Sequence, residues 1–170
     1  MEKVEVLAVV GSCASERGVY AKRVAAMTQR TLVPATRLAV SLDPVDEALS
    51  IAPWVDEPAG ALMEFPTTTP MAEVIGALAE EAAPTVLVGV VCVVDAAHLI
   101  DDLWRDTYRA RVVGGGFGRP ATENVAEALV TANQIEFASH IVLVNWSTLQ
   151  TQELSMVMAV VSHLAPRARL

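Results

Sequence analysis

Apolar runs alternate with amphipathic stretches along the chain. A β-branched run at residues 4–10 ends at a glycine, and a longer Val-rich run at residues 85–94 is continuous, as in a strand buried on both faces of a parallel sheet. Shorter apolar runs at residues 36–42, 60–65 and 141–144 predict three further strands. Because the strands are separated by stretches of helical periodicity, we expect a three-layer α/β/α domain with a mainly parallel sheet.

The segments between the strands predict helices, joined by loops rich in proline, threonine and glycine. The helices are expected over residues 18–29, from about residue 71, and over residues 97–108, 121–138 and 152–164. Residues 45–59 are the least regular part, with prolines at positions 53 and 58, and PTTTP at residues 66–70 is a loop that can cap the next helix. The glycine-dense residues 114–120 predict a loop.

Length and composition favour a single globular domain over residues 1–170. Hydrophobic residues make up 53% of the 170 residues and charged residues 19%, which excludes a disordered chain. The longest apolar run covers residues 86–94 and is too short for a bilayer, which needs roughly 20 residues. The amino-terminal MEKVEVLAVVGS lacks the basic flank and cleavage site of a signal peptide. We therefore expect a cytoplasmic protein that has no membrane contact.

Charge and cysteine content exclude nucleic-acid binding, a disulfide framework and a Cys-rich zinc site. The formal net charge of −8 repels nucleic acid, because binding it requires Lys and Arg to neutralise phosphates. Cys13 and Cys92 lie far apart and belong to no CxxC pair, so a disulfide framework and a Cys-rich zinc site are both excluded. The remaining expected partner is another protein.

Ligands of parallel α/β sheets bind beyond the carboxyl ends of the strands. In this chain, residues 11–18, 64–70, 95–98 and 145–149 each follow a predicted strand directly. These four segments are therefore the places where a functional site is expected.

The carboxyl-terminal half carries a resemblance to a known family. VVCVVDAAHLIDDL at residues 90–103 is similar to a "V-x-V-V-D-A" strand and its following helix, and ANQIEFASHIVLVNWSTL at residues 132–149 is similar to "E-Q-I-E-F-A-D-x-I-V-L-N-K-x-D-L". HLAPRARL at residues 163–170 is similar to "L-N-P-R-A-x-I". Together these motifs resemble the CobW-type P-loop GTPases of the CobW/HypB/UreG group. The resemblance implies a P-loop NTPase-like domain that binds and hydrolyses GTP and helps to allocate a metal such as zinc or cobalt. The carboxyl-terminal domain of larger family members is expected to be absent.

The resemblance places a nucleotide site on GSCASERG, residues 11–18, with Gly11, Ser15, Arg17 and Gly18 as phosphate-loop residues. A phosphate loop needs glycines, a Lys for the phosphates and a Ser or Thr hydroxyl for Mg²⁺. Here Glu16 stands at the second glycine, Arg17 at the Lys and Gly18 at the hydroxyl residue. An ordinary β-to-α turn fits these replacements better than a working loop, so GTP remains a possible ligand and Mg²⁺ a doubtful one.

The guanine-binding motif of the family, Asn-Lys-x-Asp, corresponds to Asn145-Trp146-Ser147-Thr148. Asn145 is retained, whereas Thr148 offers at most one neutral hydrogen bond in place of the carboxylate that selects guanine. Trp146 either stacks on a base or is a surface aromatic, and the surface position is favoured. Asn145 and Thr148 complete the degenerate nucleotide site.

Glu64 is the candidate catalytic residue. MEFPTTTP at residues 63–70 is similar to the family's "I-E-x-x-G-L-A-D-P", which implies a position for Glu64 near Mg²⁺ and the attacking water. The glycine that would contact the γ-phosphate is absent, and the three threonines are as readily explained as a helix cap.

No metal site is expected. The family's Cys-x-Cys-Cys element would fall in residues 43–60, where this chain has no Cys or His. His98, His140 and His163 lie on separate predicted elements, whereas zinc needs convergent ligands. A thiol–imidazole pair of Cys13 with His98 or His140 has no local motif to support it.

Three functional hypotheses remain. The first is a degenerate CobW-like domain that no longer hydrolyses GTP and acts in metal homeostasis by binding or regulating a partner. The second is a GTP-binding metallochaperone, or slow GTPase, that uses Arg17 and Glu64. The third is a nucleotide sensor without catalysis. The replacements at residues 16–18 and 148 favour the first.

Overall fold

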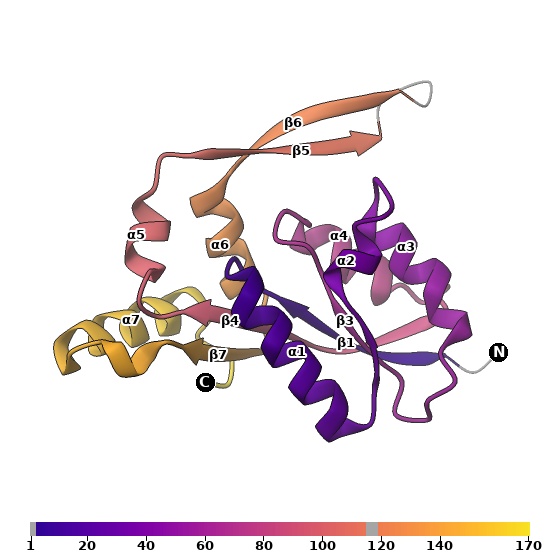
Figure 1. Ribbon diagram of the computed structural model, residues 1–170, viewed down its shortest axis with the longest axis horizontal. Helices are drawn as coiled ribbons and strands as arrows, with labels where there is room; N and C mark the ends of the chain where they lie inside the picture. Colours follow the sequence, from indigo (N-terminus) through magenta and orange to yellow (C-terminus); the bar gives the residue numbers. More distant parts are fainter. Residues whose placement is uncertain (1–2, 115–118) are drawn as a thin grey trace.

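The computed structural model describes residues 3–114 and 119–170. Within this part, five strands form one all-parallel sheet in the order β2-β3-β1-β4-β7 (Figure 1). The strands are β1 (Val4–Val10), β2 (Thr31–Val33), β3 (Ala61–Glu64), β4 (Thr85–Asp95) and β7 (His140–Val144). The structure is thus a mixed α/β fold with a parallel sheet, as the alternating apolar runs predicted.

Helices cover both faces of this sheet. They are α1 (Ala14–Thr28), α2 (Ala35–Leu38), α3 (Pro44–Ile51), α4 (Met71–Leu78), α5 (Leu99–Trp104), α6 (Glu127–Glu136) and α7 (Thr151–Leu164), with short 3-10 turns at Ala52–Trp54 and Trp146–Thr148. Side chains alternate across each strand, so Val9 packs with Ala21 and Ala25 of α1, whereas Ala8 and Val10 belong to the core on the opposite face. That second core is larger and receives buried side chains from the other helices.

The strand pairing places β1 in the middle of the sheet. Strand β1 lies between β3 and β4, with Val6 opposite Ala61 and Val10 opposite Cys92, and β7 pairs with the second half of β4. The carboxyl ends of these strands therefore meet at one edge of the sheet, where the turns that follow them approach each other.

The second strand is not where the apolar pattern of residues 36–42 placed it, and that prediction is wrong. Strand β2 is formed by Thr31–Val33, which pairs in parallel with β3, and residues 35–38 form helix α2 after Pro34. A three-residue strand has little pattern of its own, so its position is decided by the pairing with β3.

Residues 45–59 are more regular than expected, because most of α3 lies there. Asp43 caps α3 by accepting hydrogen bonds from the backbone N–H of Val45 and of Asp46, and Pro44 occupies the first helical position. An Asp-Pro pair followed by acidic residues is a typical helix start. The signal was therefore present in the sequence.

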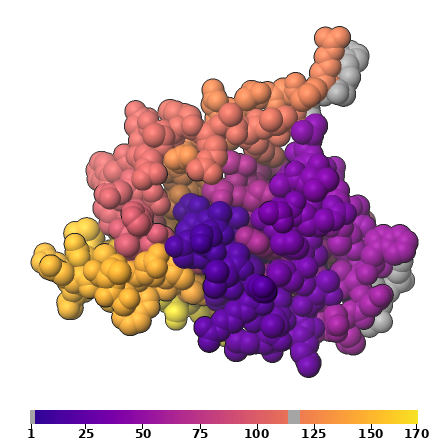
Figure 2. All heavy atoms as spheres, in the orientation of Figure 1, coloured from indigo at the N-terminus to yellow at the C-terminus, as the bar shows by residue number. Residues whose placement is uncertain are grey.

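The region between α5 and α6 also differs from the prediction. Helix α5 ends at Trp104, four residues before the predicted end, and the chain then forms an antiparallel hairpin of β5 (Tyr108–Gly114) and β6 (Pro120–Ala126). The first part of the helix predicted over residues 121–138 is strand β6, because it pairs with β5. The predicted loop at residues 114–120 falls largely on residues 115–118, outside the described part. The hairpin lies along the body of the molecule, where Arg111 of β5 pairs with Glu73 of α4 at 2.9 Å, and its far end projects (Figure 2).

In the part of the chain that the structure describes, none of the helices has the length and apolar character needed to cross a bilayer.

Candidate functional site

The turn after β1 is built around Gly11. Its φ of +146° is one that L side chains rarely adopt, and a Cβ at this position would lie 2.3 Å from the carbonyl oxygen of Val93 in β4. The close approach of the turn to β4 thus requires glycine, whether or not a phosphate ever binds there.

Residues 14–18 do not form a loop. Helix α1 begins at Ala14, and the backbone N–H of Arg17 donates to the carbonyl of Cys13 at 2.9 Å. Ser15, Arg17 and Gly18 are therefore helical residues, and Ser15 is exposed. Residues 11–13 make a short β-to-α turn, so the eight-residue loop that wraps phosphates with its N–H groups is not the path that this chain follows.

The side chain of Arg17 turns into the protein and is 3% exposed. Its Nε donates to Glu64 Oε1 at 2.8 Å, and one terminal nitrogen donates to the carbonyl of Gly11 at 2.5 Å and to Thr67 Oγ1 at 2.9 Å. The positive charge expected to face phosphate is thus neutralised within the protein.

Glu64 is the buried partner of this cation. It is 6% exposed, and its second carboxylate oxygen accepts a hydrogen bond from the backbone N–H of Ala35 at 3.2 Å. Both oxygens are thereby engaged, one with α1 and the other with the start of α2. Position 18 lies beside this pair, since a Cβ on Gly18 would be 3.6 Å from Glu64 Oε1. The geometry makes Glu64 a cross-link between elements and leaves Mg²⁺ little access to it.

Asn145 and Thr148 lie together on the exposed turn after β7. Asn145 has a left-handed φ of +56°, and its Nδ2 donates to Glu16 Oε1 at 3.3 Å, which joins this turn to α1. The Thr148 hydroxyl donates to the carbonyl of Asn145 at 2.8 Å. Trp146 is 54% exposed, the surface position that the sequence favoured. The structure therefore brings the two ends of the predicted nucleotide site close together on the surface.

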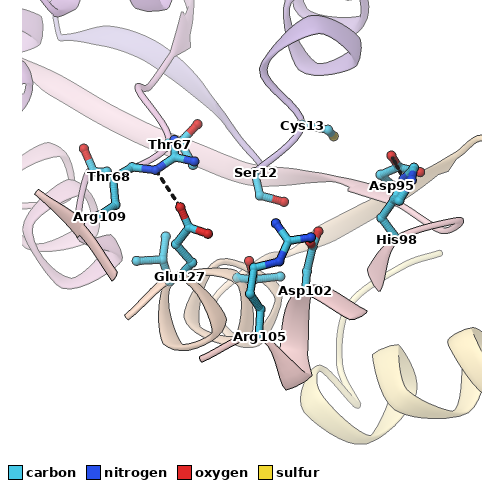
Figure 3. Close-up of a pocket in the computed structure, with 12 residues that line it drawn as sticks. Ser12, Cys13, Thr67, Thr68, Asp95, His98, Asp102, Arg105, Arg109 and Glu127 are labelled. Atoms are coloured by element: carbon cyan, nitrogen blue, oxygen red, sulfur yellow. Dashed lines mark hydrogen bonds and ion pairs between the residues drawn. The ribbon is translucent and has the colours of Figure 1, made fainter. Parts of the chain in front are cut away.

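A separate cavity of about 230 Å³ opens at the same sheet edge (Figure 3). It lies among the turn after β1, the loop after β3, the end of β4, helices α5 and α6, and the base of the hairpin. Its lining residues are Ser12, Cys13, Thr67, Thr68, Asp95, His98, Asp102, Arg105, Arg109, Glu127, Val130 and Thr131.

Ion pairs hold the charged side chains of this cavity. Arg109 Nε donates to Glu127 Oε1 at 2.9 Å, and an Arg105 nitrogen lies 3.3 Å from Asp102 Oδ1. Hydrogen bonds from Thr107 and Arg109 lower the pKa of Glu127, whereas burial raises the pKa of Asp102. The two carboxyl groups thus shift in opposite directions, because Glu127 accepts hydrogen bonds and Asp102 is partly buried.

Asp95 and His98 form another pair on the cavity wall. The imidazole Nδ1 of His98 donates to Asp95 Oδ2 at 2.7 Å, and Asp95 Oδ1 accepts from the backbone N–H of Ala97. The hydrogen bond with Asp95 raises the pKa of His98. Asp95 thus shapes the start of α5 and orients a histidine.

Cys13 is not a prepared nucleophile. Its Sγ donates to the carbonyl of Val93 at 3.4 Å, and burial, followed by the charges of Glu16 and Asp95, raises the pKa of the thiol to about 11. Burial also raises the pKa of Cys92. Since the thiolate is the reactive form, both cysteines are expected to be inert near neutral pH.

Within residues 3–114 and 119–170, no group of three or more Cys, His, Asp and Glu residues is arranged to hold a metal ion. His98 precedes α5, His140 begins β7, and His163 lies in α7.

The sequence predicted the location of this cavity better than the residues that line it. Residues 11–18, 64–70 and 95–98 all contribute, as expected from the strand ends. Arg105, Arg109 and Glu127 were not singled out as site residues, because they reach the cavity from the end of α5, from the hairpin and from α6. Gln134, inside the segment that carries the resemblance, is buried beneath it.

Comparisons with protein-family models, with curated proteins and with solved structures each found no match to this chain.

Proposed function

We propose that this chain is a CobW-like P-loop NTPase-type domain that has lost GTP hydrolysis and works by binding a protein partner. The observation that carries the proposal is the side chain of Arg17, which lies in a buried network with Glu64, Gly11 and Thr67. A cation that is already neutralised is not available to polarise a phosphate. The same network occupies both oxygens of Glu64, the candidate catalytic carboxylate.

The other residues of the predicted nucleotide site also support the loss of GTP hydrolysis. Gly18 has no hydroxyl for Mg²⁺, and α1 begins early enough to make residues 14–18 helical. Asn145 and Thr148 satisfy each other and Glu16, so a guanine base would compete with existing hydrogen bonds. The connection to metal homeostasis rests on the resemblance of residues 90–103 and 132–149 to the family.

Binding of a protein partner is supported by the β5–β6 hairpin. It extends from the body as a two-stranded ribbon (Figure 1), and Tyr108 and Val112 are 66% and 46% exposed. Such ribbons are marginally stable alone, and contact with another surface would add to their stability. The second candidate function, a GTP-binding protein or slow GTPase, is favoured by the convergence of Glu16 and Asn145 at the carboxyl edge of the sheet.

A titration with a fluorescent GTP analogue, with and without Mg²⁺ and Zn²⁺, separates these candidates when combined with a phosphate-release assay. We expect neither saturable binding nor phosphate release above a buffer blank. Saturable binding without turnover would favour the nucleotide sensor. Magnesium-dependent turnover that co-elutes with the protein, and that Glu64→Gln lowers while Glu57→Gln at an exposed position before β3 does not, would overturn the proposal.

A further inference from the structure

A narrow recess adjoins the cavity and has a distinct character. Its volume is about 10 Å³, the size of one small polar group, and Ser12, Asp95, Asp102 and Thr131 line both the recess and the cavity. Gln134 lines the recess but not the cavity, also borders a third space between α4 and α6, and is 2% exposed. Its Nε2 donates to the carbonyl of Thr67 at 2.9 Å, while its Oε1 has no donor among the described residues.

A buried amide oxygen without a donor is unfavourable, so the recess needs a group that carries N–H or O–H. The charged residues that line it, within the described part of the chain, are the carboxylates of Asp95 and Asp102. Burial raises the pKa of Asp102, the charges of Arg105 and His98 lower it in part, and the charge of Asp95 raises it. The recess therefore favours a donor with positive charge.

The outer cavity differs from the recess, because basic side chains line it as well. Arg105, Arg109 and His98 line it but not the recess. The turn at Ser12 and Cys13 leads into the amino terminus of the 15-residue helix α1, where the Cys13 side chain makes no capping hydrogen bond within the described residues. The amino terminus of a helix favours an anion.

The balance of charge also restricts the ligand. Asp95, Asp102 and Glu127 lie beside His98, Arg105 and Arg109, respectively, on the cavity wall (Figure 3), and each carboxylate is within 3.3 Å of its basic partner. A polyphosphate would require an excess of positive charge. A molecule with one positive and one negative group binds without any excess of positive charge in the site.

We propose that this cavity binds a small zwitterion of amino-acid size, with its ammonium group in the recess and its carboxylate in the outer cavity. The ammonium group donates to Gln134 Oε1 and to the carboxylate of Asp102. The carboxylate lies toward Arg105 and the start of α1. This inference does not depend on the fate of GTP hydrolysis, since it uses neither Arg17 nor Glu64.

The test screens the proteinogenic amino acids one at a time by thermal denaturation, followed by isothermal titration calorimetry of those that raise the Tm. A ligand that binds the folded state raises the Tm. We expect at least one amino acid to do so, and its analogues lacking either the amino or the carboxyl group to be ineffective at the same concentration.

Two variants locate the ammonium group. Asp102→Asn keeps the shape of the side chain, and Gln134→Leu removes the unpartnered oxygen. Each should weaken binding roughly 10- to 100-fold, the scale of a hydrogen bond to a charged group. Asp101→Asn is the matched control, because Asp101 lies on the same helix, is exposed and lines neither space; it should bind like the wild type.

Three results would overturn the proposal. The first is that no amino acid changes the Tm or gives a heat of binding, as expected if a water molecule fills the recess. The second is that the analogue without an amino group binds as well as its parent. The third is that Asp102→Asn, shown to be folded by circular dichroism, binds with unchanged affinity.

Discussion

Two polar regions lie next to each other at the carboxyl edge of the sheet, and they differ in how their charges are used. Around Arg17 the cation is buried and hydrogen-bonded to the acceptors of Glu64, Gly11 and Thr67. In the neighbouring cavity, the ion pairs of Arg105 and Arg109 are partly exposed. One region is closed by its own side chains and the other is open.

The difference lies in whether protein groups alone satisfy the charged side chains at the strand ends. Burying a guanidinium is costly unless it is paired and hydrogen-bonded, and Arg17 meets that requirement with protein groups alone. A site closed in this way contributes to folding. The recess beside the open cavity is lined by Gln134, whose side-chain oxygen has no donor among the described residues, and a ligand is able to satisfy it.

The largest expected effect comes from removing the buried cation of Arg17. Arg17→Ala leaves the Glu64 carboxylate buried without its partner, and we expect it to lower the free energy of unfolding by about 3–5 kcal/mol. Urea denaturation measures this loss. The matched control is Arg37→Ala, which removes an exposed ion pair with Glu47 and should cost less than about 1 kcal/mol.

The double variant Arg17→Met with Glu64→Leu removes both charges, so it should be more stable than Arg17→Ala. Equal losses in Arg17→Ala and Arg37→Ala would show that the buried pair contributes no more than a surface one.

The next largest effect concerns Cys13, between the two regions. A thiol whose pKa is about 11 instead of 9.0 has roughly 100-fold less thiolate near pH 8, and the thiolate is the reactive form. Iodoacetamide should therefore alkylate Cys13 slowly in a folded Cys92→Ser variant, as measured by mass spectrometry. The same variant unfolded in urea is the control and should react at the ordinary rate; equal rates in the two states would contradict the burial of this thiol.

A smaller effect distinguishes the two glycines of the predicted phosphate loop. Gly11→Ala should destabilise the fold by about 1–3 kcal/mol, because it combines an unfavourable φ with a contact to Val93. Gly18→Ala should instead stabilise α1 by about 0.5–1 kcal/mol, since alanine is the better helix former and a Cβ fits there. Thermal denaturation of both variants measures the effects, and a stabilising Gly11→Ala would refute the close approach to β4.

The smallest effect is electrostatic and lies on the wall of the open cavity. Asp95 raises the pKa of His98, so Asp95→Asn should lower it, as followed by NMR titration of the imidazole. Because the pKa of His98 is raised on folding, its contribution to stability is complete below the unfolded value, near pH 6.5. That contribution disappears as the pH rises through the folded value. An unchanged titration in Asp95→Asn would show that the pair does not form in solution.

Much of the sheet could be predicted from the sequence, for a clear physical reason. The runs at residues 4–10 and 85–94 are long, continuous and β-branched, so they form strands in almost any context. The carboxyl-edge location of the cavity followed from the same pattern. Helix α3 was missed although its signal, Asp43-Pro44 followed by Asp46, was present.

The positions of strands β6 and β2 had no signal in the local sequence. The segment 120–126 is compatible with a helix by composition, and its pairing with β5, residue by residue from Ala126 to Pro120, made it a strand. Strand β2 was likewise positioned by its pairing with β3. Such pairings depend on contacts between distant residues, which periodicity does not contain.

By itself, the sequence determined the alternation of strands and helices, because hydrophobic periodicity reflects which face of each element is buried. It also supplied a charge at position 17 and a carboxylate at position 64. The tertiary structure decided that these two meet 47 positions apart in the chain, inside the protein instead of around a ligand. It also decided that Gln134 has an unpartnered oxygen beside Asp102. Burial and pairing belong to the packed fold as a whole, and they determine whether a polar residue supports the structure or is available to bind.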